Sequence, residues 1–379
     1  MVCQRDREAD VAVIPRKIHL IAAARPNFMK IAPLYHALKG ESWCRAAIVH
    51  TGQHYDYNMS DSFFRDLKLP EPDFHLEVGS GSHAEQTGRV MIEYEKIAED
   101  IHPDWIVVVG DVNSTLACAL VGTKLSIPVV HLEAGLRSGD RRMPEEINRL
   151  ATDAIADVLW TPSADADANL LRENVPAEKI DRVGNFMIDS YEMLREAIVA
   201  SRMAERMALS PRGYAVVTLH RPANVDSADA LASLIAQLSS ASSVLPMVFA
   251  VHPRTRKRLE EFGLMTILEN CPGIRLTTPL AYIEFMNLVS NAAVVVTDSG
   301  GVQEETTYLG IPCLTLRDTT ERPITIEEGS NRLVKTEALN DALGDVLNGR
   351  FRAGRRPALW DGKAAERAVV ALRRRAKIE

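Results

Sequence analysis

The chain has 379 residues, more than one ordinary compact core holds, so two domains are expected. Hydrophobic residues make up 46% and charged residues 25%, which is typical of a globular protein and excludes a disordered one. The formal net charge of −7 argues against a protein that coats nucleic acid or an anionic membrane. A few cations in one cleft would still hold a phosphate ligand.

The five cysteines are scattered and show no CxxC spacing, so we expect buried thiols rather than disulfides or a metal site. No apolar run approaches the ~20 residues of a membrane span. The first ten residues are charged where a signal peptide needs an apolar stretch. These features predict a cytoplasmic protein.

Apolar runs alternate with amphipathic stretches, the βαβα rhythm of parallel sheets covered by helices. In the first half, a strand over Lys17–Ala24 leads into a helix that begins at Pro26 and ends near Leu38. Further strands are predicted at Ala46–His50, Trp105–Val109 and Pro128–Leu132, and a helix at Ser114–Leu125.

The rhythm restarts after about residue 190. We therefore predict an α/β fold with two Rossmann-like, doubly wound domains, at 1–190 and 191–355, followed by a C-terminal helix at 356–379. The junction near 185–212 is expected to be helical. The second half has predicted strands at Tyr214–Leu219, Met247–Val251, Ile274–Thr277, Ala293–Thr297 and Pro312–Leu316, and predicted helices at Ala228–Ser239, Tyr282–Val289 and Val302–Tyr308.

Polar side chains stand where many of these predicted strands end. Ligands of open α/β sheets bind at the carboxyl ends of the strands, so one site in an interdomain cleft is expected. Taken singly, each has a plainer interpretation: an aspartate after a strand is often a helix N-cap, and a lone histidine is more often structural than catalytic. The residues at strand ends are Arg25, Asp111, Glu133, His220, His252 and Asp298.

The segment Asp298-Ser299-Gly300-Gly301 stands directly before a predicted helix. Backbone N–H groups at a helix N-terminus bind phosphate, and Glu305, one turn further, is suited to accept ribose hydroxyls. Neither GxGxxG nor the Walker pattern occurs, so a dinucleotide or P-loop site is not expected. A tight turn before a helix explains the glycines equally well. The cations available for a diphosphate are Arg25, Lys30 and Arg322.

Two segments, 133–137 and 143–149, carry carboxylates beside arginines. Surface ion pairs on a capped helix would explain them, but Glu133 ends an otherwise apolar strand. Asp111, Glu133 and Glu145 near His220 form a general acid–base set. No histidine or cysteine cluster has zinc spacing, and no GxSxG motif is present, so no metal is expected.

These motifs, in this order, resemble the non-hydrolysing UDP-N-acetylglucosamine 2-epimerases. The resemblance runs from about Lys17 to Leu333 and is most specific in the block from EAGLR to PEEINR (133–149) and the block from TDSGG to ERP (297–323). It implies a glycosyltransferase-B-like pair of domains closing over a UDP-sugar, without cofactor or metal. It also implies elimination and re-addition of UDP through 2-acetamidoglucal, a homodimer, and a place in cell-surface polysaccharide synthesis.

The resemblance also assigns roles to residues. It marks Asp111, Glu133, Glu145 and His220 as catalytic. Phe285 would lie by the uracil, although on an amphipathic helix it could equally be a core residue. The residues expected to bind substrate are Arg25, Lys30, His252, Phe285, Ser299, Gly300, Gly301, Glu305 and Arg322.

Two departures leave the sugar open. Ala24-Arg25-Pro26 lacks the threonine of many relatives, and the loop at 140–144 is short; both features also occur in relatives acting on 2,3-diacetamido uronic-acid sugars. Against that, Glu321-Arg322-Pro323 resembles the N-acetylglucosamine group. A hydrolysing epimerase, a glycosyltransferase of the same fold and a non-catalytic UDP-sugar-binding protein are the other interpretations. Around Gln53 and His54 the sequence differs from relatives with a regulatory substrate site, so weak regulation or none is expected.

Overall fold

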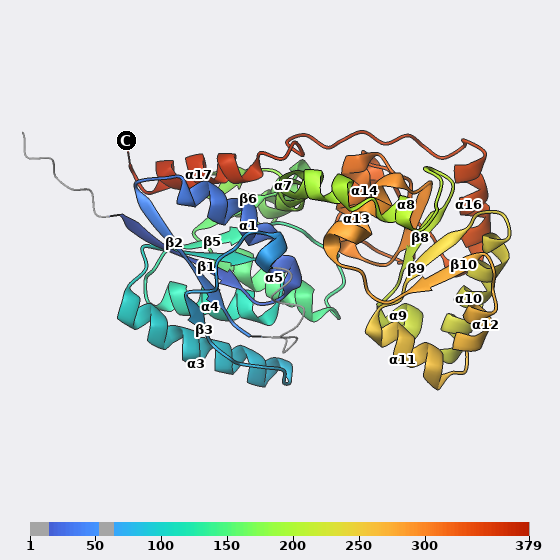
Figure 1. The fold of residues 1–379 in the computed structure, drawn as a ribbon. Helices are drawn as coiled ribbons and strands as arrows, with labels where there is room; N and C mark the ends of the chain where they lie inside the picture. The colour runs from blue at the N-terminus through green and yellow to red at the C-terminus, as the bar shows by residue number, and fades with distance from the viewer. Residues whose placement is uncertain (1–14, 53–63, 379) are drawn as a thin grey trace, which may run out of the picture.

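The computed structural model describes residues 15–52 and 64–378. They form two α/β domains placed side by side (Figure 1), each built on a parallel sheet. The first sheet has seven strands in the order β3-β2-β1-β4-β5-β6-β7, and the second has six in the order β10-β9-β8-β11-β12-β13. In both, the strand order reverses beside the first strand of the domain, the arrangement of a doubly wound fold. The predicted fold class is confirmed.

The first domain begins with a strand that the sequence placed almost correctly. β1 pairs in parallel with β2 along its whole length and with β4 on its other side. α1 starts at Arg25 with Pro26 in its first turn, where the missing N–H of proline leaves no bond broken. The strands of this sheet are β1 (Arg16–Ala22), β2 (Cys44–His50), β3 (Phe74–His75), β4 (Trp105–Val109), β5 (Val129–Leu132), β6 (Val158–Thr161) and β7 (Ile180–Arg182).

The helices of this half lie on both faces of the sheet. α3 and α4 pack together on one face, while α1 packs with α7 on the other. Both faces are buried, so β4 is a continuous apolar run, Trp-Ile-Val-Val-Val, rather than an alternating one. The helices are α1 (Arg25–Lys39), α3 (His83–Ile101), α4 (Asn113–Lys124), α5 (Pro144–Ile155), α6 (Ala164–Arg172) and α7 (Phe186–Ser201), with a short 3-10 helix at Ala177–Lys179.

The second domain repeats the pattern. Its strands are β8 (Ala215–Thr218), β9 (Met247–Ala250), β10 (Ile274–Thr277), β11 (Val294–Thr297), β12 (Cys313–Thr315) and β13 (Asn331–Leu333). Its helices are α8 (Met203–Arg206), α9 (Pro222–Val225), α10 (Ala228–Ser242), α11 (Pro253–Glu261), α12 (Met265–Glu269), α13 (Tyr282–Asn291), α14 (Gly300–Leu309), α15 (Ile324–Glu327) and α16 (Leu339–Leu347), with a 3-10 helix at Thr336–Ala338.

One apolar core runs from the first sheet into the second. It includes Ile18 and Leu34 of the first domain, Ile188 of α7 and Val295 of the second sheet. The predicted domain boundary at residue 190 falls inside α7, which packs against α1, α13 and α14. The junction is helical, as expected, and it is part of the shared core.

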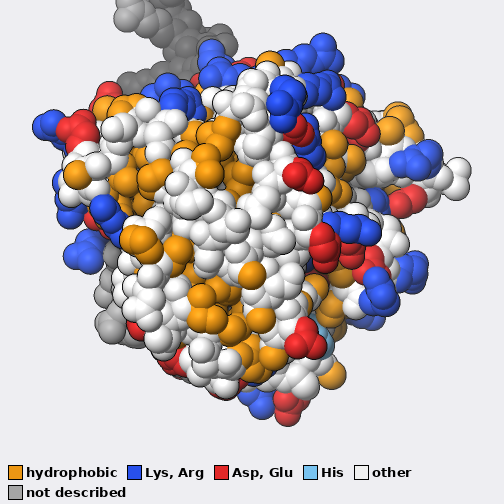
Figure 2. Space-filling view, turned by 90° about the vertical axis from the view of Figure 1, so that its right-hand side faces the viewer, with side chains coloured by type: hydrophobic (Ala, Val, Ile, Leu, Met, Phe, Trp, Pro, Cys, Tyr) orange, Lys and Arg blue, Asp and Glu red, His pale blue; other side chains and the backbone are white. Residues whose placement is uncertain are grey.

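After α16 the chain returns across the molecule to the first domain (Figure 1), where α17 (Ala364–Arg375) packs against α1. The helix predicted at 356–379 therefore spans 364–375. At the opposite end, where α10, α12 and α16 lie, Figure 2 shows patches of hydrophobic side chains. The exposed hydrophobic residues at this end of the molecule include Val244, Ile267 and Leu347.

Candidate functional site

The site residues come from the carboxyl ends of strands in both sheets. Asp111 follows β4 and Glu133 follows β5 in the first domain, while His220 and Asp298 follow β8 and β11 in the second. β4 and β11 each lie beside the first strand of their sheet, at the point where the strand order reverses. This is where open α/β sheets bind ligands.

Glu133 is held in an unusual backbone conformation. Its φ is +73°, in the left-handed region that non-glycine residues seldom adopt, and the N–H groups of Glu133 and Ala134 both donate to the Trp160 carbonyl at 3.1 Å. The carboxylate is buried and ion-paired with Lys30 of α1 and, at 2.8 Å, with Arg322 of the second domain. Burial opposes ionisation, but Lys30 and Arg322 outweigh it and lower the pKa of Glu133.

Asp111 lies in a contrasting environment. It is ion-paired with Arg149 of α5, and about a third of its side chain, 34%, remains exposed. Although part of the side chain is accessible, the protein around the carboxyl shields it from solvent; this burial, opposed by Arg149 and reinforced by the charge of Glu133, raises the pKa of Asp111. Asp111 is not a helix cap, because the N-cap of α4 is Val112.

The buried acid on α5 is Glu146 rather than Glu145. Glu146 pairs with Arg149 at 2.7 Å and accepts the backbone N–H groups of Ser138 and Gly139 at 3.0 and 2.9 Å. Glu145 is exposed and outside this network, and its charge acts on Arg221 of the second domain. Sequence reasoning missed Glu146 and Arg149; their spacing of three, which puts both on one helix face, was the available signal.

In the second domain Asp298 orients His220. The Asp298 carboxylate lies 2.8 Å from His220 Nδ1 and accepts the backbone N–H groups of His220 and Arg221. Asp298 does not cap its own helix, because the N-cap of α14 is Ser299. His252 has a structural role as the N-cap of α11, accepting the Arg254 N–H at 3.2 Å, and its ring centroid lies 5.4 Å from that of His220.

Arg322 joins the two domains through its ion pair with Glu133. Besides Glu133, it contacts Glu304 at 3.0 Å and Glu321. Burial disfavours a charged guanidinium, but Glu304, Glu321 and Glu133 keep it ionised. A Cβ at Gly300 would lie 2.7 Å from Arg322 Nη1, so glycine at this position leaves room for the guanidinium. Gly301 has open space around it, with Met187 Cε the nearest atom at 3.9 Å.

Glu305 faces Tyr282 in the interior of the second domain. The Tyr282 hydroxyl donates to Glu305 at 2.7 Å. Burial raises the pKa of Glu305 to about 8, and the nearby charge of Glu304 acts in the same direction. Arg25, at the start of α1, is close enough for its charge to act on Glu305. Phe285 packs against the core while partly exposed, which leaves both interpretations of it open.

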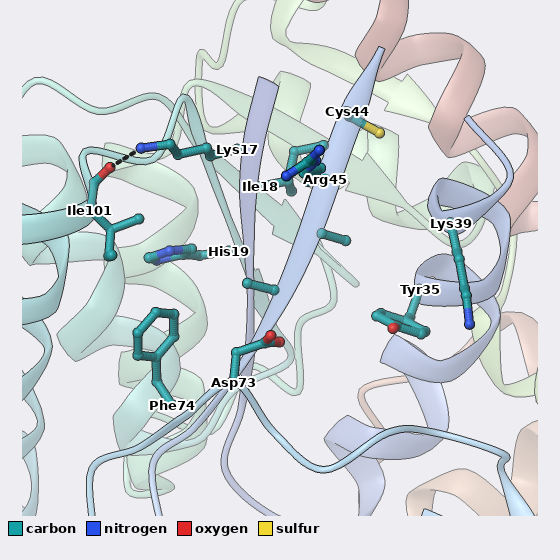
Figure 3. Close-up of a pocket in the computed structure, with 12 residues that line it drawn as sticks. Lys17, Ile18, His19, Tyr35, Lys39, Cys44, Arg45, Asp73, Phe74 and Ile101 are labelled. Atoms are coloured by element: carbon teal, nitrogen blue, oxygen red, sulfur yellow. Dashed lines mark hydrogen bonds between the residues drawn. The ribbon is translucent and has the colours of Figure 1, made fainter. Parts of the chain in front are cut away.

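A separate groove lies at the opposite edge of the first sheet (Figure 3). Its volume is about 450 Å³, and it is lined by the amino-terminal parts of β1 and β2 and the ends of α1 and α3, including Lys17, Lys39 and Arg45. Its position at the amino ends of the strands separates it from the site residues. Gln53 and His54 lie outside the described residues.

Within residues 15–52 and 64–378, no helix is both long enough and apolar enough to span a membrane. The same part of the chain contains no group of three or more His, Cys, Asp or Glu side chains placed to hold a metal ion.

Comparisons with known proteins agree with this geometry. The family model described as UDP-N-acetylglucosamine 2-epimerase matches residues 36–373. The UDP-N-acetylglucosamine 2-epimerase of Methanocaldococcus jannaschii is 43% identical, covering 94% of this chain and 98% of the relative. The UDP-2,3-diacetamido-2,3-dideoxy-D-glucuronate 2-epimerase of Pseudomonas aeruginosa is 41% identical, covering 84% and 88%.

Solved structures agree as well. The Methanocaldococcus jannaschii UDP-GlcNAc 2-epimerase in complex with UDP-GlcNAc and UDP superposes with a TM-score of 0.86 at 42% identity, covering 94% of this chain and 99% of that one. A lipopolysaccharide outer core galactosyltransferase, 12% identical with a TM-score of 0.53 and coverage of 94% and 99%, shares the fold alone. The fold is glycosyltransferase-B-like, and the chain belongs to the UDP-N-acetylglucosamine 2-epimerase family.

Proposed function

We propose that this chain reversibly converts UDP-N-acetylglucosamine to UDP-N-acetylmannosamine by eliminating and re-adding UDP, without releasing free sugar. The observation that carries the proposal is the 2.8 Å ion pair between Glu133 of one domain and Arg322 of the other. It puts a carboxylate suited to proton transfer and a cation suited to diphosphate at one point between the domains. The related enzyme solved with UDP-GlcNAc and UDP, which matches along nearly the whole chain, supports the same substrate.

The chemistry explains why both groups are needed. The proton on carbon 2 is not acidified by a neighbouring carbonyl, so direct removal is very difficult. In the proposed elimination, UDP leaves with the electron pair of the C1–O bond while a carboxylate takes the carbon-2 proton, which forms a C1–C2 double bond. Re-addition delivers a proton to the opposite face of carbon 2 and restores the C1–O bond. Cations stabilise the leaving diphosphate and carboxylates carry the protons.

The two carboxylates are suited to different halves of this exchange. Lys30 and Arg322 keep Glu133 ionised, which suits it to accept a proton. The raised pKa of Asp111 suits it to hold one and return it. Carboxylates whose environments push their pKa values apart are the usual arrangement for paired acid and base work. Glu145, exposed at the start of α5, is assigned only a positioning role.

The second domain supplies the groups for the nucleotide. With Nδ1 held by Asp298, His220 is oriented to present its other ring nitrogen to the leaving phosphate oxygen. Ser299 and Gly301 at the start of α14 offer the N–H groups and partial positive charge of a helix N-terminus. Binding of a diphosphate would draw Arg322 towards the phosphates and leave Glu133 ready for the sugar.

Incubation of the purified chain with UDP-N-acetylglucosamine in deuterated water, followed by proton NMR, tests the proposal. UDP-N-acetylmannosamine is expected to form, and deuterium should enter carbon 2 of both nucleotide sugars. Accumulating free N-acetylmannosamine would instead identify a hydrolysing enzyme, and no exchange without an acceptor would favour a glycosyltransferase or a binding protein. The same incubation with a UDP-2,3-diacetamido uronic acid identifies the sugar, since exchange confined to that compound would contradict the proposed substrate.

A further inference from the structure

A buried histidine, His131, links the two loops that carry Asp111 and Glu133. It lies in β5 and is 0% exposed. Its Nδ1 is 2.6 Å from an Asp153 carboxylate oxygen, and its Nε2 is 2.8 Å from the backbone carbonyl oxygen of Gly110. Gly110 directly precedes Asp111, so one ring contacts α5 on one side and the Asp111 turn on the other.

Both atoms that His131 contacts are hydrogen-bond acceptors. A carbonyl oxygen has no proton to give, and a neutral imidazole has one nitrogen that can only accept. The other carboxylate oxygen of Asp153 accepts the Gly135 N–H at 3.0 Å and pairs with Arg137 at 2.7 Å, as an ionised carboxylate does. Two short contacts to acceptors therefore require a proton on each ring nitrogen. The charge balance agrees, because the cluster of Asp153, Glu173, Arg137 and His131 is then neutral.

The same cluster holds the Glu133 loop. Asp153 accepts the Gly135 N–H at 3.0 Å and contacts Arg137 at 2.7 Å. Glu133 and Gly135 both have positive φ, +73° and +81°, so this loop needs support from its surroundings. His131 thus connects, through one ring and one carboxylate, the backbone on which both proposed proton carriers stand.

We infer that His131 is a positioning residue whose two ring N–H groups fix the Asp111 turn against the Glu133 loop for the proposed epimerisation. It has no access to substrate and takes no part in proton transfer itself. The role of His131 rests on the proposed function, whereas its protonation follows from geometry alone. A displacement of about 1 Å in a reacting group costs up to ~10²-fold in rate, so loss of this contact should be visible in turnover.

Two substitutions separate the contacts of the ring. His131→Asn keeps a donor near Asp153 and loses the bond to Gly110, whereas His131→Gln keeps a donor towards Gly110. His19→Gln is the matched control: His19 lies in β1, two strands from β5 in the same sheet, is 1% exposed and contacts Tyr94 rather than the site. We expect His131→Asn to lower kcat about 10- to 100-fold, His131→Gln to be less affected, and His19→Gln to match wild type. UDP affinity, measured by calorimetry, should change less than about 3-fold in all three.

Nitrogen-15 NMR of the histidine-labelled full chain tests protonation without any substrate. At pH 7.5, both ring nitrogens of His131 should carry protons, and that pair of signals should vanish in His131→Asn. An unprotonated nitrogen on His131 would overturn the inference, as would wild-type turnover in His131→Asn with UDP affinity retained. If His131→Asn does not fold, Asp153→Asn replaces it and should lose the doubly protonated signature. A wild-type chain that shows this signature but epimerises no UDP-sugar refutes the proposed function and leaves the protonation standing.

Discussion

Asp111 and Asp298 occupy equivalent places in the two domains, each just after the strand beside which the sheet order reverses, yet their environments differ. Asp111 keeps a third of its side chain exposed and has a raised pKa. Asp298 is fully buried; burial opposes its charge, but His220 and the surrounding donors outweigh burial and lower its pKa. The same residue type at the same position in the fold therefore has two environments: one carboxylate is partly exposed beside Arg149, and the other is buried and holds a histidine.

The largest effect is expected for Asp111→Asn, which removes a proposed proton carrier. Turnover in the deuterium-exchange assay should fall at least ~10²-fold, with little change in UDP affinity. The free energy of unfolding at pH 7 should not fall, because the raised pKa of Asp111 means that the native state disfavours its charge.

Asp140→Asn is the control for Asp111→Asn, since Asp140 belongs to an ion pair with the exposed Arg142. It should leave turnover unchanged. Wild-type exchange in Asp111→Asn would show that Asp111 takes no part in the reaction. The proposed difference in role between Asp111 and Asp298 would then be wrong.

Asp298→Asn should show the reverse pattern. The amide would present N–H groups to the backbone donors of His220 and Arg221, so we expect a loss of about 1–3 kcal/mol in the free energy of unfolding, measured with urea. Turnover should fall about 10-fold, because His220 loses its orientation.

His220→Gln combined with Asp298→Asn sharpens the comparison. If Asp298 acts through His220, the two substitutions together should slow turnover little more than His220→Gln alone. Independent, multiplying effects would show that Asp298 acts directly.

Much of this arrangement was predictable from the sequence. β4 has the predicted bounds, because a buried apolar run flanked by polar residues has few alternatives. β10 also has the predicted bounds, although only Ile274 of its four residues is buried. α3 was not predicted, although Ser82 and Glu85 form a capping box at its start, which was the available signal. The short edge strands β3 and β7 were missed because few residues give little periodicity.

The position of the site was predictable, but the ion-pair partners of its residues were not. Strand ends located Asp111, Glu133, His220 and Asp298, because parallel strands bring their carboxyl ends to one edge. The choice between Glu145 and Glu146 depends on which side of α5 each residue occupies, and the spacing of three between Glu146 and Arg149 was the only signal for it. The pairing of Glu133 with Arg322, 189 positions apart, needed the packing of two domains.

Glu305 is a third carboxylate, and its substitution gives the smallest effect. It is also the most direct check that burial raises the pKa of a carboxyl in this protein. The pKa of Glu305 is raised from 4.5 to about 8, so the native state binds a proton that the unfolded chain releases between these values. The stability that protonated Glu305 contributes is therefore present at low pH and is lost as pH rises towards about 8.

Glu305→Gln keeps an acceptor for Tyr282 and cannot ionise. From pH 6 to pH 7, its free energy of unfolding relative to wild type should rise by about 1.4 kcal/mol, the equivalent of one pH unit. Urea titrations at the two pH values measure this change, and the exposed Glu95→Gln should show none. A constant difference between Glu305→Gln and wild type would mean that Glu305 is charged throughout, like Glu133, and that burial does not raise its pKa.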